Sequence, residues 1–484
     1  MYKKTKNYFI LFKKMNYDKT IEIVHRDFDN SIIPALQDYI RIDNLSPEYD
    51  PEWKTNGKLE KAAQHIIDWA LKQGIKGMKA QMLKEENRTP MVYITIPATS
   101  EDIKQTILLY AHFDKQPHMS GWKEGLGPLN PVIRDGYLYG RGASDDGYAS
   151  FTIVESIKAI EEQGGKHGKI FITIEGGEES GSPDLMYYLN KIAPEMGKPD
   201  FMICMDSGCI DYNTLWITTS LRGICKVDLT VEVLKESVHS GSGSGIAPDS
   251  FSIMRQLLDR LEDSKTSKVV DDLQVQIPDY RIEDAKKLAE YQKEKIVHEA
   301  VKLLDGVKPL SDDYSEIILN NTWRAMMTVV GMTGFPAAEG AGNVLRDKTK
   351  CKISMRLPPT YDCKKAGQVM CEILTKDKPY NAKITAESSH SGNGFASKNF
   401  SDKVKNSFNA SSNKLFGKDF YCFGEGGSIP FISELGKQYP ECEILVTGIL
   451  GPNTNAHCPN EALNIKYTES MAVALAHLIN DYSA

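Results

Sequence analysis

Hydrophobic and polar positions follow two different periods along this chain. Apolar side chains recur at helical spacing across 20–42 and, more regularly, across 58–73, which predicts two amphipathic helical segments. A third helix is expected at about 147–163. Short β-branched, apolar runs predict buried strands at 91–96, 106–113, 169–175, 201–205 and 442–451. We interpret these runs as strands of an open α/β sheet.

From Gly223 onward the pattern changes. The run KVDLTVEV alternates apolar and polar residues, as a half-buried strand does, and helical stretches follow at about 249–262 and 284–304. Two further strand-like runs, TKCKISMRL and AKITAES, complete this part. We expect an inserted α+β unit between the two halves of the first domain. The predicted division is a first domain of residues 1–222 and 393–484, interrupted by a second domain of residues 223–392.

Composition narrows the class of protein. A chain of 484 residues exceeds what one core usually supports, which favours two domains. The net charge of −7 argues against nucleic acid as a partner, and no apolar run approaches the ~18 residues of a membrane span. Nine cysteines, an odd number without a C-x-x-C pair, do not resemble a disulfide framework. We therefore expect a reduced, cytoplasmic protein.

The N-terminal segment has basic residues on both sides of a short apolar core at Tyr8–Phe12. This core is shorter than the ~7–15 apolar residues of a signal peptide, and no small-residue cleavage site follows it. We expect a disordered extension before Met15.

The stretch KIFITIEGGEESGSPD at 169–184 organises the candidate chemistry. A buried strand stops at two glycines, and the adjacent carboxylates Glu178 and Glu179 follow at once. In an open α/β sheet, ligands gather where strands end at their carboxyl edge. Adjacent side chains on such a loop diverge, so one acid can bind a metal while the other faces a reacting water. Alone, such a pair is usually a solvated turn.

Other predicted strands also end in residues that can bind metals. His112 and Asp114 end the strand at 106–113, and alternation puts both on one side, where the carboxylate can orient the imidazole. Asp206 follows the strand at 201–205, and His457 follows the last one. Asp145 stands at a helix start, where it could cap the helix or bridge two cations with its two oxygens.

Together these residues predict a site for two divalent cations. Imidazole and carboxylate ligands without thiolates suit zinc, manganese or cobalt. Two dications carry four positive charges, which three carboxylates and one hydroxide neutralise. Such a pair of cations lowers the pKa of a bridging water, and Glu178 is left to take its proton and pass it to the leaving nitrogen. The candidate ligands are His112, Asp145, Glu179, Asp206 and His457.

Eight motifs occur in the order seen in one known family: YAHFDKQP, GRGASDD, EGGEESGS, MDSG, VHSG, MRLPP, GEGGSIP and NAHCPNE. They resemble the cytosolic non-specific dipeptidase and carnosinase family of di-metal aminoacyl peptidases, related to carboxypeptidase G and aminoacylases. The resemblance implies an α/β fold with a mixed-sheet, zinc-peptidase-like catalytic domain and an inserted α+β lid. It implies that the lid makes a homodimer and lends residues to the partner's site.

The resemblance also implies roles for individual residues. His112 and Asp206 would bind one metal, Glu179 and His457 the other, and Asp145 would bridge them. Glu178 would be the general base and Asp114 the orienting acid. The implied substrate contacts are His239 on the scissile carbonyl, Asn343 as a second lid contact, and Arg356 and Ser428 on the substrate carboxylate.

The sequence departs from the family in two places. Gly147 stands where a lysine usually follows the paired aspartates, and Phe113 and Lys115 replace commoner residues in the histidine motif. Neither change removes a ligand. We expect Lys115 to add a positive charge near the site and to shift substrate preference.

The predicted function is metal-dependent hydrolysis of dipeptides, using two zinc or manganese ions per subunit. An N-acyl-amino-acid deacylase or a carboxypeptidase would use the same site, and a non-catalytic peptide-binding relative is a third interpretation. The sequence has no G-x-S-x-G serine nucleophile and no H-E-x-x-H motif. The expected partner is a small peptide, with neither nucleic acid nor a membrane.

Overall fold

The computed structural model describes residues 15–298, 301–426 and 430–484. The extension expected before Met15 therefore lies outside the described residues. Among the described helices, none is both long and apolar enough to cross a bilayer.

The chain forms two compact units. The first consists of the residues up to Ile217 with Phe400–Phe420 and Tyr439–Ala484, and the second of Thr218–Asn399 with Tyr421–Gln438. The second unit thus includes all of the predicted insertion at 223–392 and takes in a later segment that the sequence pattern did not indicate. Its role as a lid stays a prediction.

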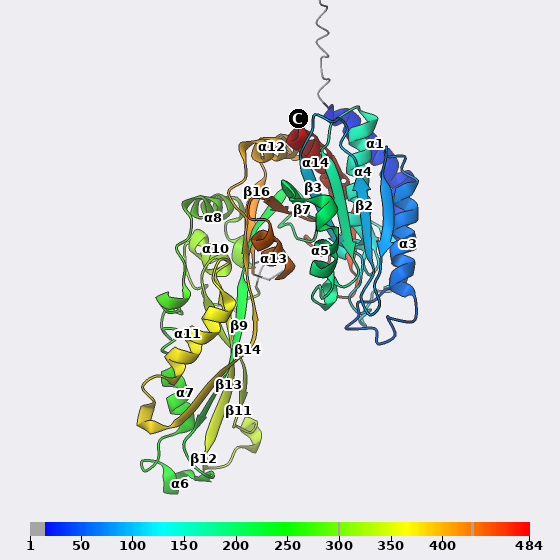
Figure 1. Cartoon of the computed structure of the whole chain (residues 1–484). Helices are drawn as coiled ribbons and strands as arrows, with labels where there is room; N and C mark the ends of the chain where they lie inside the picture. The colour runs from blue at the N-terminus through cyan, green and yellow to red at the C-terminus, as the bar shows by residue number, and fades with distance from the viewer. Residues whose placement is uncertain (1–14, 299–300, 427–429) are drawn as a thin grey trace, which may run out of the picture. The chain divides into compact units, whose positions relative to one another are not determined.

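The first unit is built on a mixed sheet (Figure 1). In spatial order its first six strands are β1 (Lys79–Leu83), β2 (Met91–Ile96), β6 (Lys169–Glu175), β3 (Thr106–His112), β7 (Phe201–Cys204) and β17 (Glu443–Val446). The pairs β1–β2 and β2–β6 are antiparallel, whereas β3 is parallel to both β6 and β7, and β7 is parallel to β17. Because parallel strands end at the same edge, the residues that follow β3, β6 and β7 gather there.

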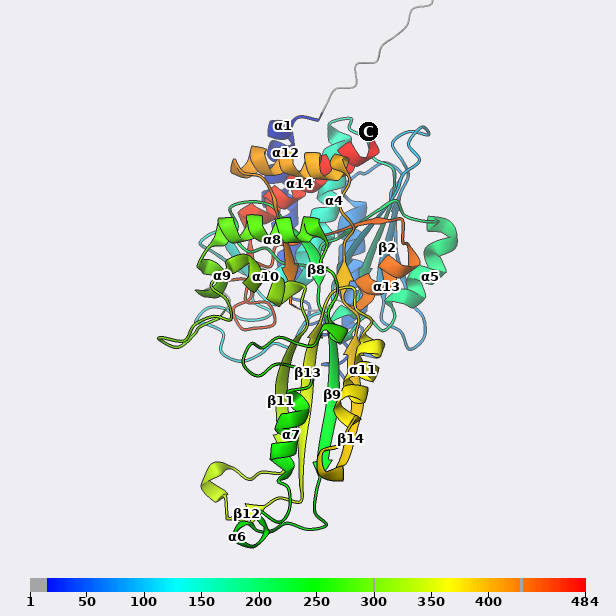
Figure 2. The ribbon, with the colours of Figure 1, turned by 90° about the vertical axis from the view of Figure 1, so that its left-hand side faces the viewer.

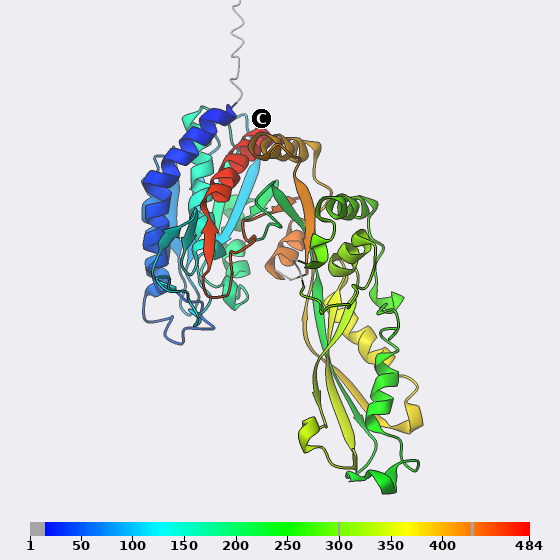
Figure 3. The ribbon, with the colours of Figure 1, turned by 180° about the vertical axis from the view of Figure 1, so that it is seen from behind.

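Helices cover both faces of this sheet. Figures 1 and 3 show α3 and α4 against one face and α5 against the other. A smaller sheet, β18–β5–β4, also belongs to this unit. The remaining bounds are α1 (Tyr17–Asp27), α2 (Ile33–Ile40), α3 (Lys58–Leu71), β4 (Val132–Arg134), β5 (Tyr137–Tyr139), α4 (Tyr148–Glu162), α5 (Leu185–Met196), α12 (Asp402–Phe416), β18 (Ala462–Asn464) and α14 (Ile465–Ser483).

The predicted helical segment at 20–42 is two α-helices rather than one. A wider turn at Phe28–Ile32 separates α1 from α2, and Pro34 lies in the first turn of α2. Proline has no N–H to donate, so the ladder of a continuous helix is interrupted there. The apolar spacing that the sequence shows continues across the break.

The second unit contains a four-stranded antiparallel sheet in the order β11–β13–β9–β14. Strand β9 alternates buried and half-buried residues along its whole length, as its sequence predicts. Figure 2 shows α7 and α11 on one face of this sheet. The bounds of the sheet and its two helices are β9 (Gly223–Glu232), α7 (Ser250–Leu258), β11 (Met326–Thr333), β13 (Lys348–Leu357), α11 (Cys363–Thr375) and β14 (Lys383–Gly392).

A short antiparallel ribbon of β10 and β12 extends this unit, and strands β15 and β16 both pair with β8, which begins at the last residues of the first unit. The helical stretch predicted at 284–304 begins earlier, at Asp279, and is divided into α8 and α9, of which α9 ends at His298. The bounds are β8 (Trp216–Leu221), β10 (Val238–His239), α6 (Ser240–Gly243), α8 (Asp279–Gln292), α9 (Lys295–His298), α10 (Tyr314–Thr322), β12 (Val344–Leu345), β15 (Phe395–Ala396), β16 (Tyr421–Glu425) and α13 (Pro430–Gln438).

One buried acid, Glu155, makes the stability of the first unit depend on pH. Glu155 lies on α4 with no exposed surface. Burial, reinforced by the negative charge of Asp27, raises the pKa of Glu155 to about 9. The folded protein therefore keeps a proton on Glu155 at neutral pH, whereas the unfolded chain releases it at the ordinary glutamate pKa.

We predict that Glu155→Gln stabilises the protein at alkaline pH relative to acidic pH. Below the unfolded pKa both states are protonated, so stability is lost only as pH rises from there towards the folded pKa, by at most about 1.4 kcal/mol per pH unit. Glutamine carries no such proton. Thermal unfolding at about pH 6 and about pH 8.5 measures the difference, with exposed Glu22→Gln as control. An equal effect of Glu155→Gln at both pH values would contradict the assignment.

Candidate metal centre

The ends of three parallel strands position the candidate residues. His112 is the last residue of β3 and pairs in register with Glu175, the last residue of β6. Gly176 follows, and a Cβ there would stand 2.6 Å from the Phe113 ring, so only glycine allows this close approach. The chain then turns through Glu178 and Glu179 at the same edge of the sheet.

A first set of ligand atoms comes from three different strand ends and loops. His112 Nε2 lies 3.2 Å from Asp145 Oδ1 and 3.9 Å from Asp206 Oδ1. The His112 side chain has no exposed surface, and the side chains of Asp145 and Asp206 are 6% and 10% exposed. These three side chains can hold one cation between them.

A second set shares Asp145 with the first. His457 Nε2 lies 2.9 Å from Asp145 Oδ2 and 3.5 Å from Glu179 Oε1. The two oxygens of Asp145 thus face different histidines, one in each set. The structure therefore brings together all five residues that the sequence suggested as ligands, with Asp145 between the two sets.

The chemistry of these side chains fits divalent cations. Glu179 Oε1 is buried and accepts no hydrogen bond from the described residues. Burial, and then the charge of Asp145, raises the pKa of Glu179 to about 8. Burial also favours the neutral form of Asp145, but hydrogen bonds to His112 and His457 outweigh it and lower the pKa of Asp145. Excess buried negative charge of this kind is what a pair of cations neutralises.

Asp114 supports both the histidine and the acidic turn. Its Oδ1 lies 3.3 Å from His112 Nδ1, the ring nitrogen that faces away from the ligand atoms. Its two oxygens also accept the backbone N–H groups of Glu178 and Glu179, at 3.1 and 3.0 Å. A carboxylate in this position holds a metal-binding imidazole in one orientation. Here it fixes the neighbouring turn as well.

Glu178 stands apart from the ligand sets. Among the described residues, none donates a hydrogen bond to its carboxylate, which leaves both oxygens available. Burial raises the pKa of Glu178, and the negative charge of Asp206 adds to the effect. A carboxylate without a hydrogen-bond donor can accept a proton from a neighbouring water and pass it on.

Two other residues in the motifs, Asp146 and Lys115, bind backbone groups near the site. Asp146 does not cap α4 with its side chain: its Oδ2 accepts the backbone N–H of His112, at 3.2 Å, and so supports the end of β3. Lys115, which was expected to add a positive charge near the site, directs its amine to backbone carbonyls. Its buried amine donates to three carbonyls at the end of α2, those of Tyr39, Ile40 and Ile42.

The residues suggested for substrate contacts belong to the second unit. His239 ends β10, is exposed, and accepts the N–H of Gly241 on Nδ1 at 3.1 Å. The carbonyl of Asn343 accepts the N–H of Ser240, at 2.8 Å, so Asn343 lies close to His239. Arg356 lies on β13, away from this ribbon. Ser428 lies outside the described residues.

The sequence interpretation missed a second guanidinium near Arg356. Arg222 is only 8% exposed, and its Nε has no hydrogen-bond partner among the described residues. Burial, and then the positive charge of Arg356, lowers the pKa of Arg222 to about 10. Both side chains are in the second unit. A single sequence offers no signal for this pairing, because the two positions are far apart along the chain.

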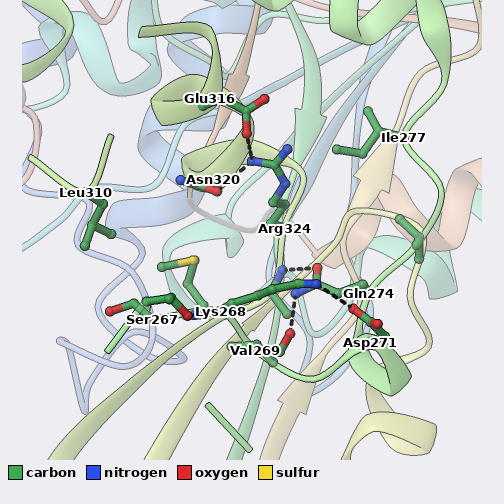
Figure 4. A pocket seen from close by; sticks show the side chains of 14 residues that line it. Ser267, Lys268, Val269, Asp271, Gln274, Ile277, Leu310, Glu316, Asn320 and Arg324 are labelled. Carbon is green, nitrogen blue, oxygen red and sulfur yellow. Dashed lines mark hydrogen bonds and ion pairs between the residues drawn. The ribbon is translucent and has the colours of Figure 1, made fainter. Parts of the chain in front are cut away.

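The second unit also has a hollow of about 480 Å³ between the end of α10 and the start of β11 (Figure 4). Arg324 NH1 in this hollow pairs with Glu316 Oε2 and Asn320 Oδ1, each at 2.8 Å. Lys268 pairs with Asp271 at 3.2 Å. Since these opposite charges neutralise one another, we assign no function to this hollow.

An α/β unit that carries two ligand sets joined by a shared carboxylate is an arrangement that suits a di-metal hydrolase. The model of peptidase family M20/M25/M40 matches residues 108–481. The chain belongs to this family, which confirms the predicted metallopeptidase class and the predicted fold class.

Individual relatives agree with this family. The chain is 26% identical over 388 residues to a cysteinylglycine-S-conjugate dipeptidase of Corynebacterium striatum, covering 78% of this chain and 81% of the relative. The solved structure of the dipeptidase Dug1p of Saccharomyces cerevisiae has a TM-score of 0.67 at 21% identity, covering 98% and 100% of the two chains. The M20 family metallo-carboxypeptidase Sso-CP2 of Sulfolobus solfataricus has a TM-score of 0.68 at 20% identity, covering 93% and 99%. The last two likenesses show the fold.

We predict that the protein binds two divalent ions and that single ligand changes remove them differently. His457→Ala should leave one ion bound, because His112, Asp145 and Asp206 remain. Asp145→Asn should weaken both, since this residue takes part in both sets. Metal analysis after equilibrium dialysis against Mn²⁺ or Zn²⁺ measures the content, with exposed His298→Ala as control. Two tightly bound ions in Asp145→Asn would rule out the shared ligand.

Proposed function

We propose that this protein is a dipeptidase that hydrolyses the peptide bond of small peptides with a free C-terminal carboxylate. The observation that carries the proposal is the pair of ligand sets that share Asp145, with the unpaired carboxylate of Glu178 beside them. The relatives named dipeptidases support the choice of substrate. The donor set suits zinc or manganese, and we propose one ion for each ligand set.

Each residue near the ligand sets has one task in the proposed reaction. Two bound cations would polarise the scissile carbonyl and increase the acidity of water. Glu178 takes the proton of the attacking water and donates it to the leaving nitrogen, because its carboxylate accepts no hydrogen bond from the described residues and is open to the water. Asp114 keeps His112 oriented and keeps the Glu178 turn in place through two backbone hydrogen bonds.

The second unit supplies recognition of the substrate in this proposal. Arg356 holds the free carboxylate, because a guanidinium offers a fork of N–H donors to a carboxylate. Arg222, buried beside it, adds a second positive charge. His239 polarises the scissile carbonyl, and Asn343 and Ser428 make further contacts. These assignments rest on the family motifs that contain the residues.

We also propose a homodimer in the cytoplasm, formed through the second unit. Its edge strand β11 carries the apolar side chains Val330 and Met332, which are 54% and 44% exposed. A partner subunit would bury these side chains. All nine cysteines are free thiols, in keeping with a reducing compartment.

A carboxypeptidase that acts on longer peptides is the second candidate, since the solved structure of Sso-CP2 carries that name. An N-acyl-amino-acid deacylase would use the same metal ligands and the same base. A peptide-binding relative without activity is disfavoured, because the ligand residues and Glu178 are all present. Substrate length and the two ends of the substrate distinguish these functions.

We predict hydrolysis of dipeptides, with much slower cleavage of their C-terminal amides, of longer peptides and of N-acyl amino acids. Glu178→Gln should bind both ions as before and lose about 100- to 10,000-fold in turnover, since a positioned base contributes that much. Released amino acids are measured with added Mn²⁺ or Zn²⁺, and exposed Glu124→Gln is the matched control. Equal rates on free and amidated dipeptides would exclude the carboxylate contact, and full activity of Glu178→Gln would exclude the base.

We predict that mixed dimers recover activity when each chain carries a different defect. His239→Ala and Glu178→Gln chains with different tags are co-expressed, and the doubly tagged dimer is purified. If the second unit of one chain serves the partner's metal site, one intact site forms per mixed dimer. Activity no higher than that of the two parent variants would mean that His239 acts within its own chain, and a monomer by light scattering would exclude the dimer.

A further inference from the structure

Glu461 is a buried acid that the proposed mechanism does not use. It follows His457 by four residues and directly precedes β18, and it has no exposed surface. Five hydrogen bonds end on its carboxylate. Its Oε1 accepts Ser144 N at 3.0 Å, Ser144 Oγ at 3.2 Å and Asp145 N at 3.1 Å, and its Oε2 accepts Arg141 NH1 at 2.7 Å and Gly142 N at 3.1 Å.

The loop before α4 wraps around this carboxylate. The N–H groups of Gly142, Ser144 and Asp145 all point at it, an arrangement in which successive amides enclose one anion. Gly142 has a φ of 82°, and a Cβ there would meet the side chain of Lys115 at 2.6 Å, so the loop is also confined from its other side. The backbone of Asp145 is therefore held at a fixed place.

Arg141 continues the connection to the other ligand loops. Its guanidinium is only 1% exposed and donates to the carbonyl of Pro117 at 3.1 Å and to that of Cys458 at 3.1 Å, besides Glu461. Cys458 is the neighbour of His457, and Pro117 follows the strand end that carries His112. One buried ion pair thus joins the loops of three metal-ligand residues.

We propose that Glu461 and Arg141 form a positioning pair that sets the separation of the two metal sites. The inference rests on the proposed function, in that two cations bind between the ligand sets. Asp145 can serve both cations only if its two oxygens face His112 and His457 at once. Glu461 fixes the backbone of Asp145, and Arg141 fixes the segment that carries His457 to the same anchor. Neither side chain contacts the ligand atoms themselves, so both act through the ligands.

The pair is suited to this task because it is neutral as a unit. An additional unpaired charge in this place would change the balance of the metal ligands, whereas a carboxylate and a guanidinium cancel. The removal of one partner leaves the other charge buried and unpaired, which is strongly unfavourable. Partners that orient metal ligands typically contribute about 10- to 100-fold to metal affinity.

The test measures metal binding rather than hydrolysis. The full-length protein is freed of metal with a chelator and titrated with Mn²⁺, while electron paramagnetic resonance separates single ions from spin-coupled pairs. We expect Glu461→Gln to bind the second ion about 10- to 100-fold more weakly and to lose the spin-coupled signal. Arg281→Met removes a buried arginine of the second unit that pairs with Asp284, and it serves as the matched control that keeps both ions.

A milder variant keeps the test decisive if Glu461→Gln does not fold. Arg141→Lys retains the positive charge beside Glu461 but cannot reach the carbonyls of Pro117 and Cys458 together. We expect it to weaken the ion at His457 more than the ion at His112. A lower melting temperature with both ions bound at the affinity of the unchanged protein and with the spin-coupled signal intact would overturn the proposal.

The two proposals fail in different ways. If the unchanged protein binds a spin-coupled pair of Mn²⁺ ions but cleaves no dipeptide, the dipeptidase function is wrong, and the effect of Glu461→Gln still decides the positioning role. If it cleaves dipeptides while Arg141→Lys and Glu461→Gln bind metal normally, only the positioning role is wrong.

Discussion

The structure of the first unit depends on the concentration of negative charge at one buried sheet edge. Asp145, Glu179 and Asp206 converge there with Glu178. Two histidines, His112 and His457, stand among them in the part of the chain that the structure describes. Carboxylates so close together and so little exposed cannot all be ionised unless cations compensate them. Burial and the negative charges of neighbouring carboxylates raise the pKa values of Glu178 and Glu179 for the same reason. Two divalent cations would compensate these charges, and Asp145 is the residue through which both sets are joined.

Such a site needs a rigid support, and the described residues show where it comes from. Asp114 binds the turn after β6 and lies beside the histidine at the end of β3, so two strand ends are held by one side chain. Asp146 binds the backbone of His112 from the opposite loop. Lys115 is drawn away to the end of α2, where its amine satisfies three carbonyls. These three polar side chains therefore stabilise the site mainly through hydrogen bonds to backbone groups.

Sequence periodicity predicted the strands and the residues that end them, because a buried strand and its terminating glycines are local features. His112, Glu179 and Asp206 could be proposed on that basis alone. The direction of the Lys115 side chain could not be predicted, because a position at the end of a strand does not reveal which backbone carbonyls lie nearby. Nor could the pair of Glu461 and Arg141, which are 320 positions apart in sequence and meet only in the folded chain. Pro34 indicates a break between α1 and α2, but the apolar residues keep a helical spacing across it, so the spacing alone predicts one continuous segment.

Under the proposed function, the two units contribute side chains of opposite charge to the reaction. The first unit offers carboxylates and imidazoles, which suit cations and proton transfer but cannot hold the negative end of a peptide. The second unit places two guanidinium groups, Arg222 and Arg356, close enough for one to lower the pKa of the other. Two buried or half-buried cations that repel each other are stabilised by an anion between or beside them. A free substrate carboxylate is such an anion, whereas an amide is not. Under the proposed function, a free substrate carboxylate relieves the repulsion between the two arginines. The site therefore selects peptides with a free C-terminus.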